Sequence, residues 1–243
     1  MTDTQTRVLI LGSAPAAVAA KDWERSPFTH IVAINNAWRI RNDWDVLIHP
    51  EDFPVENRPA AALSSQSIVG AADYVPLQND YGGFVYAGGT MAFTAGYWAL
   101  AALRPSVLAY FGCDMVYPSA GKTHFYGTGA ADPLRADVSL RSLEAKSARL
   151  GLFGAAQGCR IVRLSNGESR LVYPSVASTS LGSVDLPCTH GMSAALQREK
   201  ELGYYVPSGR YWEHSDAFDT DRIDELDKMW LSAYRQSALG KVA

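Results

Sequence analysis

The stretch that decides the fold is residues 100–127, LAALRPSVLAYFGCDMVYPSAGKTHFYG. Within it, residues 106–111 are apolar and β-branched or aromatic without alternation, which predicts a strand buried on both faces of a sheet. Gly112 ends this run, and the loop that follows collects polar side chains. In open α/β sheets, ligands bind at the carboxyl ends of the strands. We therefore expect this loop to form the floor of the functional site.

The composition is that of an ordinary globular protein. The chain has 243 residues, 47% of them hydrophobic and 19% charged, with a formal net charge of −3. This charge does not predict capture of nucleic acid by a basic surface. The three cysteines do not have the spacing of a metal site or of a disulfide framework. The N-terminal apolar run predicts a first strand rather than a signal peptide. No apolar run is long enough to span a membrane. We therefore expect a cytoplasmic protein without a transmembrane segment.

Strand-like and helix-like runs alternate as far as Pro174. Strands are predicted at 7–11, 30–34, 45–48, 67–69, 106–111 and 160–164. Helices are predicted at 15–22, 37–41, 91–103 and 138–157, with an irregular aromatic segment at 73–84. The alternation predicts an α/β fold of the Rossmann-like kind, a mostly parallel sheet with helices on both faces.

The character of the chain changes after Pro174. Residues 175–190 are rich in Ser and Thr, and 192–202 and 221–239 have the spacing of amphipathic helices. A segment of this size with a loop in its middle would have a marginal core by itself. We therefore predict a Rossmann-like nucleotide-binding catalytic domain at 1–174 and a helical extension at 175–243 packed on it. The apolar stripe of the last helix is compatible with self-association into a homo-oligomer.

His124 is the strongest candidate for chemistry. An imidazole with a pKa near neutral suits a general base, and the same loop carries Tyr117, Lys122 and Tyr126. Tyrosine hydroxyls can donate to a leaving phosphate without adding charge, and a lysine can pair with it. On the residues alone, the alternative is a surface histidine without a catalytic role.

Two turns offer backbone groups to a ligand. Gly12 and Ser13 follow the first strand, where small side chains let a ligand approach N–H groups at a helix N-terminus. The G-x-G-x-x-G fingerprint is absent. Gly89 and Thr90 open a second helix, and Thr90 is also its expected N-cap.

Other polar residues follow predicted strands. Asn35 and Asn36 end the second strand, where amides can read a base or a hydroxyl as donor and acceptor, although asparagine is also a common turn residue. Asp114 either holds a sugar or amine, or caps its loop through an Asx-turn. His49–Asp52 has metal-type side chains at adjacent positions rather than at helical spacing, so no metal site is predicted there.

Six segments, in this order, resemble one superfamily: VLILGSAPA, IVAINNAW, YAGGTMAFTAGYWAL, VLAYFGCDMVY, THFYG and RIVRLSNGES. The set resembles the bacterial sialyltransferases of the Campylobacter lipooligosaccharide type, which form glycosyltransferase family 42. It is also similar to the motility-accessory-factor glycosyltransferases and the pterin pyrophosphokinase-like proteins. The resemblance covers residues 7–170.

The sialyltransferase resemblance implies a CMP-sugar donor, an inverting transfer, no metal or other cofactor, and a glycan or small-molecule acceptor. By position, Ser13 corresponds to the polar first-turn residue, Asn35 to the nucleotide-binding asparagine, and Gly89 and Thr90 to the residues before the central helix. Asp114 corresponds to the aspartate after the central strand.

The catalytic residues implied by the same resemblance lie in the loop. His124 corresponds to the catalytic base. Tyr117 is nearest to the tyrosine that assists the departing phosphate, although it falls one residue late. The lid between Asp114 and His124 is shorter than in those sialyltransferases, and Tyr126 is the nearest substitute for a second leaving-group tyrosine.

Two other functions remain open from the sequence. A pyrophosphokinase-like transferase would use ATP and a pterin or similar alcohol. It would need Mg²⁺ to neutralise the polyphosphate, with Glu51, Asp52 and Asp114 as carboxylates. Alternatively, the chain would be a non-catalytic nucleotide-binding protein with the helical extension as its partner surface.

Overall fold

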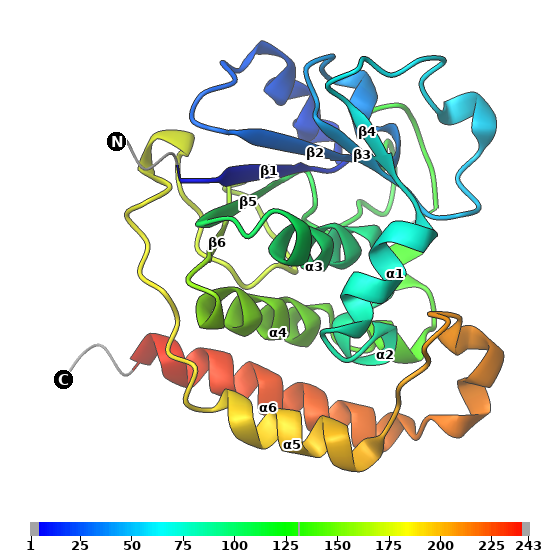
Figure 1. Cartoon of the computed structure of the whole chain (residues 1–243), viewed down its shortest axis with the longest axis vertical. Helices are drawn as coiled ribbons and strands as arrows, with labels where there is room; N and C mark the ends of the chain where they lie inside the picture. Colours follow the sequence, from blue (N-terminus) through cyan, green and yellow to red (C-terminus); the bar gives the residue numbers. More distant parts are fainter. Residues whose placement is uncertain (1–4, 131, 240–243) are drawn as a thin grey trace.

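A computed structural model describes residues 5–130 and 132–239 (Figure 1). Its centre is a sheet of six parallel strands in the order β4-β3-β2-β1-β5-β6. The strands are β1 (Arg7–Leu11), β2 (His30–Ile34), β3 (Val46–Ile48), β4 (Ser67–Val69), β5 (Val107–Phe111) and β6 (Arg160–Arg163). The predicted parallel sheet is confirmed. Because chain order reverses between β1 and β5, the switch point of the sheet lies there.

Both faces of the sheet are buried, which explains the continuous apolar runs of its strands. In β1, Val8 and Ile10 pack into one core, while Leu9 and Leu11 pack into the other. None of the four has exposed surface. Since successive side chains of a strand point to opposite faces, one apolar run fills two cores.

Helical segments cover both faces, but they differ in kind. The α-helices are α1 (Ala71–Asn79), α2 (Phe84–Ala87), α3 (Met91–Ala102), α4 (Leu143–Ala156), α5 (Met192–Leu202) and α6 (Thr220–Leu239). They lie on one side of the sheet, with α3 against β1 and β2 and α4 against β6 (Figure 1). The 3₁₀-helices Pro15–Asp22 and Asn35–Arg39 contribute Ala17 and Ala37 to the core on the opposite face.

Two predictions about the first half of the chain were wrong in detail. The alanine-rich segment predicted as an ordinary helix forms the 3₁₀-helix Pro15–Asp22, whose first turn has no side-chain cap. The segment 73–84, predicted as irregular, contains most of α1 and the start of α2. The Asp73 carboxylate accepts from the Gly70 N–H at 2.9 Å and stabilises the first turn of α1. Pro76 inside α1 obscured the helical pattern, because proline is rare in a helix interior.

Two further helices have different bounds from those predicted. The helix predicted at 37–41 is the 3₁₀-helix Asn35–Arg39. The helix predicted at 138–157 is a 3₁₀-turn over Val138–Leu140 followed by α4. The break between them is at Ser142, whose side chain accepts from the Ala145 N–H and caps α4.

The C-terminal extension adds a further layer. α5 and α6 lie beyond α4, on the side away from the sheet (Figure 1). Met192 and Trp230 of this layer share one core with Tyr86 and Leu152 of the preceding domain. The extension, as far as residue 239, therefore packs on the sheet domain.

Two buried ion pairs join α4 to the extension. Arg149 Nε lies 2.7 Å from Glu199 Oε1, and Lys146 Nζ lies 2.8 Å from Asp227 Oδ1. The Trp230 indole also donates to Glu199, at 2.8 Å. We call Lys146, Arg149, Glu199 and Asp227 the ionic junction. Burial raises the pKa of Asp227, and the Lys146 ammonium opposes this shift.

Candidate active site

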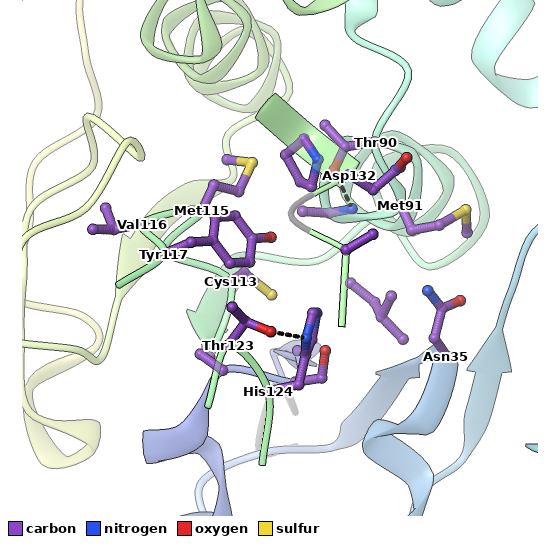
Figure 2. A pocket seen from close by; sticks show the side chains of 18 residues that line it. Asn35, Thr90, Met91, Cys113, Met115, Val116, Tyr117, Thr123, His124 and Asp132 are labelled. Carbon is purple, nitrogen blue, oxygen red and sulfur yellow. Dashed lines mark hydrogen bonds between the residues drawn. The ribbon is translucent and has the colours of Figure 1, made fainter. Parts of the chain in front are cut away.

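A small cavity lies at the carboxyl ends of β1, β2 and β5, beside the switch point of the sheet. This first cavity has a volume of about 130 Å³. Ser13, Asn35, Tyr117 and His124 all line it, although they come from three separate segments. Figure 2 shows Asn35, Tyr117 and His124 around this cavity. The sequence placed these residues after strands, and parallel strands bring their carboxyl ends to one edge.

The turn after β1 requires glycine. A Cβ atom on Gly12 would lie 2.3 Å from the Gly112 carbonyl oxygen, so the turns after β1 and β5 touch through their backbones. The Gly12 N–H donates to the Phe111 carbonyl, and the Ala14 N–H donates to the Gly112 carbonyl. This contact fixes the position of Ser13 at the cavity wall.

The loop that carries His124 is tied back to the same turn. The Phe125 N–H donates to the Ser13 carbonyl at 3.0 Å, and His124 and Gly127 exchange two backbone hydrogen bonds. The loop therefore has a defined conformation beside the first turn. His124 is held next to the cavity although it lies far from any strand.

Thr123 orients the His124 imidazole. Its Oγ1 lies 2.9 Å from His124 Nδ1, accepts from the Gly129 N–H and donates to the Gly129 carbonyl (Figure 2). A hydroxyl has one proton, and Thr123 donates it to the Gly129 carbonyl. The proton between Thr123 and His124 is therefore assigned to Nδ1, which donates to the hydroxyl oxygen. The lone pair then lies on Nε2, which is the form that a general base needs.

Aromatic rings flank the imidazole. The Tyr126 ring is stacked on His124 with centroids 5.0 Å apart, and the Tyr117 ring centroid lies 6.0 Å away. Burial lowers the pKa of His124, which favours its neutral imidazole. Burial raises the pKa of Tyr117 to about 12, so its hydroxyl keeps its proton and can donate. The pair thus combines a proton acceptor with a neutral hydrogen-bond donor.

Asn35 places a hydrogen-bond acceptor without a donor at the cavity. Its backbone φ is +51°, a left-handed conformation that asparagine tolerates better than most residues. Its buried Oδ1 accepts no hydrogen bond from any described residue. An unsatisfied buried acceptor costs free energy unless a ligand or water donates to it. Asn36 Oδ1 is likewise buried without a hydrogen bond, but Asn36 does not line the cavity.

The predicted helix-start residues have different positions. Thr90 is buried, caps α3 by accepting from the Ala92 N–H at 3.1 Å, and lines the first cavity. Gly89 lies outside it. Its N–H donates to Ser139 Oγ, and its carbonyl accepts from Arg135. Gly89 is therefore engaged within the protein, while Thr90 faces the cavity.

Three other predicted residues do not line the first cavity. Asp114 Oδ1 accepts from Ser165 Oγ at 2.5 Å, and its carbonyl accepts from the Arg170 N–H, so it joins its loop to the chain after β6. Lys122 is exposed, and Tyr126 is 45% exposed beyond the His124 ring. The structure thus brings Tyr126 to His124 but not to the cavity.

Sequence reasoning missed several residues of this region. Met91, Met115 and Asp132 line the first cavity, and Thr123 orients the base. Thr123 stood directly before His124, but only the fold reveals its contact with Nδ1. Cys113 also lines the cavity, where burial raises the pKa of its thiol well above the usual range.

A second, larger cavity adjoins the first. Its volume is about 550 Å³, and the two share Asn35, Met91 and Asp132 among their lining residues. Typical ligand pockets measure about 300–1,000 Å³. The second cavity falls in this range while the first does not, so a ligand of ordinary size would extend from one into the other.

Comparisons with profiles of protein families, with curated proteins and with solved structures give no match. The resemblance to the sialyltransferases therefore rests on the six motifs alone. Within residues 5–130 and 132–239, no helix is long and apolar enough to cross a membrane. The same residues contain no group of three or more His, Cys, Asp or Glu side chains suited to a metal ion, and Glu51 and Asp52 do not meet Asp114.

Proposed function

We propose that this protein is a nucleotide-sugar glycosyltransferase that uses a CMP-linked, sialic acid-like donor, inverts the anomeric carbon and needs no metal. The observation that carries the proposal is that His124 and Asn35 line the same cavity at the switch point of the sheet. A proton acceptor can activate an acceptor hydroxyl, and an unsatisfied amide oxygen can accept a hydrogen bond from a nucleotide base.

The proposed reaction uses three side chains. Nε2 of His124 accepts the proton of an acceptor hydroxyl while that oxygen forms a bond to the anomeric carbon. The bond from this carbon to the phosphate oxygen breaks, and the phosphate keeps the electron pair. The Tyr117 hydroxyl, protonated at neutral pH, donates to the departing phosphate. Asn35 Oδ1 accepts from an amino group of the base.

Nucleotide binding is tested by thermal unfolding with CMP, CDP, UDP, ADP and ATP, each with and without Mg²⁺. At a hundred times its dissociation constant, a ligand adds about 2.7 kcal/mol to the free energy of unfolding. We expect the largest increase in Tm with a cytidine nucleotide and no dependence on Mg²⁺. Asn35→Gly, which keeps the left-handed backbone accessible, should abolish that preference. Arg104→Gly is the matched control, because Arg104 also has a positive φ and lies outside the cavity.

Turnover is tested by release of CMP from CMP-sugars in the presence of acceptor and EDTA. Transfer of pyrophosphate from ATP to a pterin alcohol that stops on chelation would favour the pyrophosphokinase alternative. Binding of nucleotide without turnover of any CMP-, UDP- or ATP-linked donor would favour the non-catalytic alternative.

A further inference from the structure

The second cavity is walled by distant parts of the chain. Tyr74 comes from α1 and Phe84 from α2, while Tyr211 and Trp212 come from the extension. The Phe84 and Tyr211 rings are stacked at 6.3 Å, and the Tyr74 ring meets the Phe84 edge at 6.2 Å. The extension, which resembles none of the six motifs, thus supplies part of a site beside His124.

The two guanidinium groups of this cavity are already neutralised. Arg135 donates to Asp132, Asp137, the Gly89 carbonyl and Tyr211, which uses all of its N–H groups. Arg210 lies 3.6 Å from Glu51 and 3.6 Å from Glu213. Arg135 therefore has no N–H group left for an anionic ligand, and the charge of the exposed Arg210 is offset by two carboxylates.

Asp52 is different from the other carboxylates of the cavity. It is exposed, and no hydrogen bond or ion pair to it is found within the described residues. Its negative charge acts on the neighbouring Tyr74. Burial, together with Glu51 and Asp52, raises the pKa of Tyr74 to about 12. An acidic side chain beside aromatic rings favours a cation, because carboxylates and ring faces both attract positive charge.

We propose that the second cavity binds the second substrate through a positively charged amino group beside Asp52, with the carbon skeleton against the aromatic rings. This proposal rests on the proposed function in one respect: it calls the molecule that carries the amino group the second substrate. The two cavities share Asn35 and Asp132, so a molecule in the second cavity borders on the first, which His124 lines.

The test compares three probes that share a pyranose ring and differ in charge: D-glucosamine, methyl α-D-glucoside and D-glucuronate. Their dissociation constants are measured by titration calorimetry on the whole protein, with CMP measured in parallel. A hydrogen bond to a charged group contributes enough for about tenfold tighter binding. We expect glucosamine to bind about tenfold more tightly than the neutral glucoside and glucuronate to bind more weakly than both.

Asp52→Asn should remove the advantage of glucosamine over the neutral glucoside. Glu56→Gln is the control, because it removes one exposed charge nearby without touching the cavity. Equal or tighter binding of glucuronate, or an Asp52→Asn protein that keeps the preference for glucosamine, overturns the proposal. CMP binding without the amine preference leaves the proposed function standing. The amine preference without CMP binding contradicts the proposed function alone.

Discussion

The first cavity and the ionic junction are both polar, but they differ in where their unpaired polar atoms lie. In the junction, the fully buried Arg149 donates to Glu199 and to the Tyr97 hydroxyl. At the cavity, Asn35 Oδ1 has no donor, and Nε2 of His124 has no hydrogen bond within the described residues. Burial of a charged group therefore does not by itself mark a functional site. What distinguishes the cavity is that its unpaired groups line an open space. Asp227 Oδ2 of the junction also has no hydrogen-bond partner, but it lines neither cavity.

The sharpest test of this contrast is His124→Ala. Loss of a general base costs about 10²–10⁴-fold in turnover, while nucleotide binding should persist. The free energy of unfolding should change by less than about 1 kcal/mol, because the ring is only partly buried. Turnover is measured as CMP release, and stability by urea unfolding. His214→Ala, at an exposed position outside both cavities, is the control. Turnover close to that of the unaltered protein would refute the role of His124.

The opposite result is expected for Glu199→Gln. This change leaves the Arg149 guanidinium buried without its counter-charge, which costs about 3–5 kcal/mol of the free energy of unfolding. Turnover per folded molecule should be unchanged. The matched control is Glu225→Gln, in an exposed pair with Arg198 at 3.5 Å, which should cost no more than about 1 kcal/mol. If Glu199→Gln and Glu225→Gln have the same urea midpoint, the junction is not a stabilising element.

A smaller effect is expected at the residue that orients the base. Thr123→Ala removes the acceptor for Nδ1–H, so the imidazole can take the other tautomer. One lost hydrogen bond amounts to about 1 kcal/mol, which corresponds to a decrease in kcat of up to about tenfold. Thr123→Ser keeps the hydroxyl and should restore most of the rate. A serine variant as slow as the alanine variant would show that the hydroxyl does not orient His124.

The smallest expected effect is on pH dependence. Because burial lowers the pKa of His124 from the ordinary 6.5, kcat/KM should rise with pH and reach its midpoint below pH 6.5. The same shift means that the unfolded chain binds more protons in this interval. The contribution of His124 to stability should therefore decrease as the pH falls from 6.5 through the folded pKa. A midpoint above 6.5 in a kcat/KM profile would contradict the burial of this imidazole.

The strands could be predicted from the sequence because each buried parallel strand is a short apolar run between turns. The helices were harder. Pro76 concealed α1. The alanines after Gly12 are compatible with either kind of helix, and the close packing of this segment against Gly112 is visible only in the fold. Local patterns do not contain these contacts.

The site could be predicted in part for the same reason. Ser13, Asn35 and His124 follow strands or lie in the loop after β5, and a parallel sheet brings such positions together. Long-range partners could not be predicted. Asp114 was a candidate ligand but bonds to Ser165, and Tyr211 reaches Ser139 and Asp137 from the extension.

The hydrogen bond from the Phe125 amide to the Ser13 carbonyl has a consequence for motion. Any outward swing of the segment that carries the imidazole must break this bond and expose that amide to solvent. The exchange rate of a single backbone deuteron would therefore report how often the His124 imidazole leaves its place, and binding of the proposed nucleotide at the turn after β1 should slow that exchange.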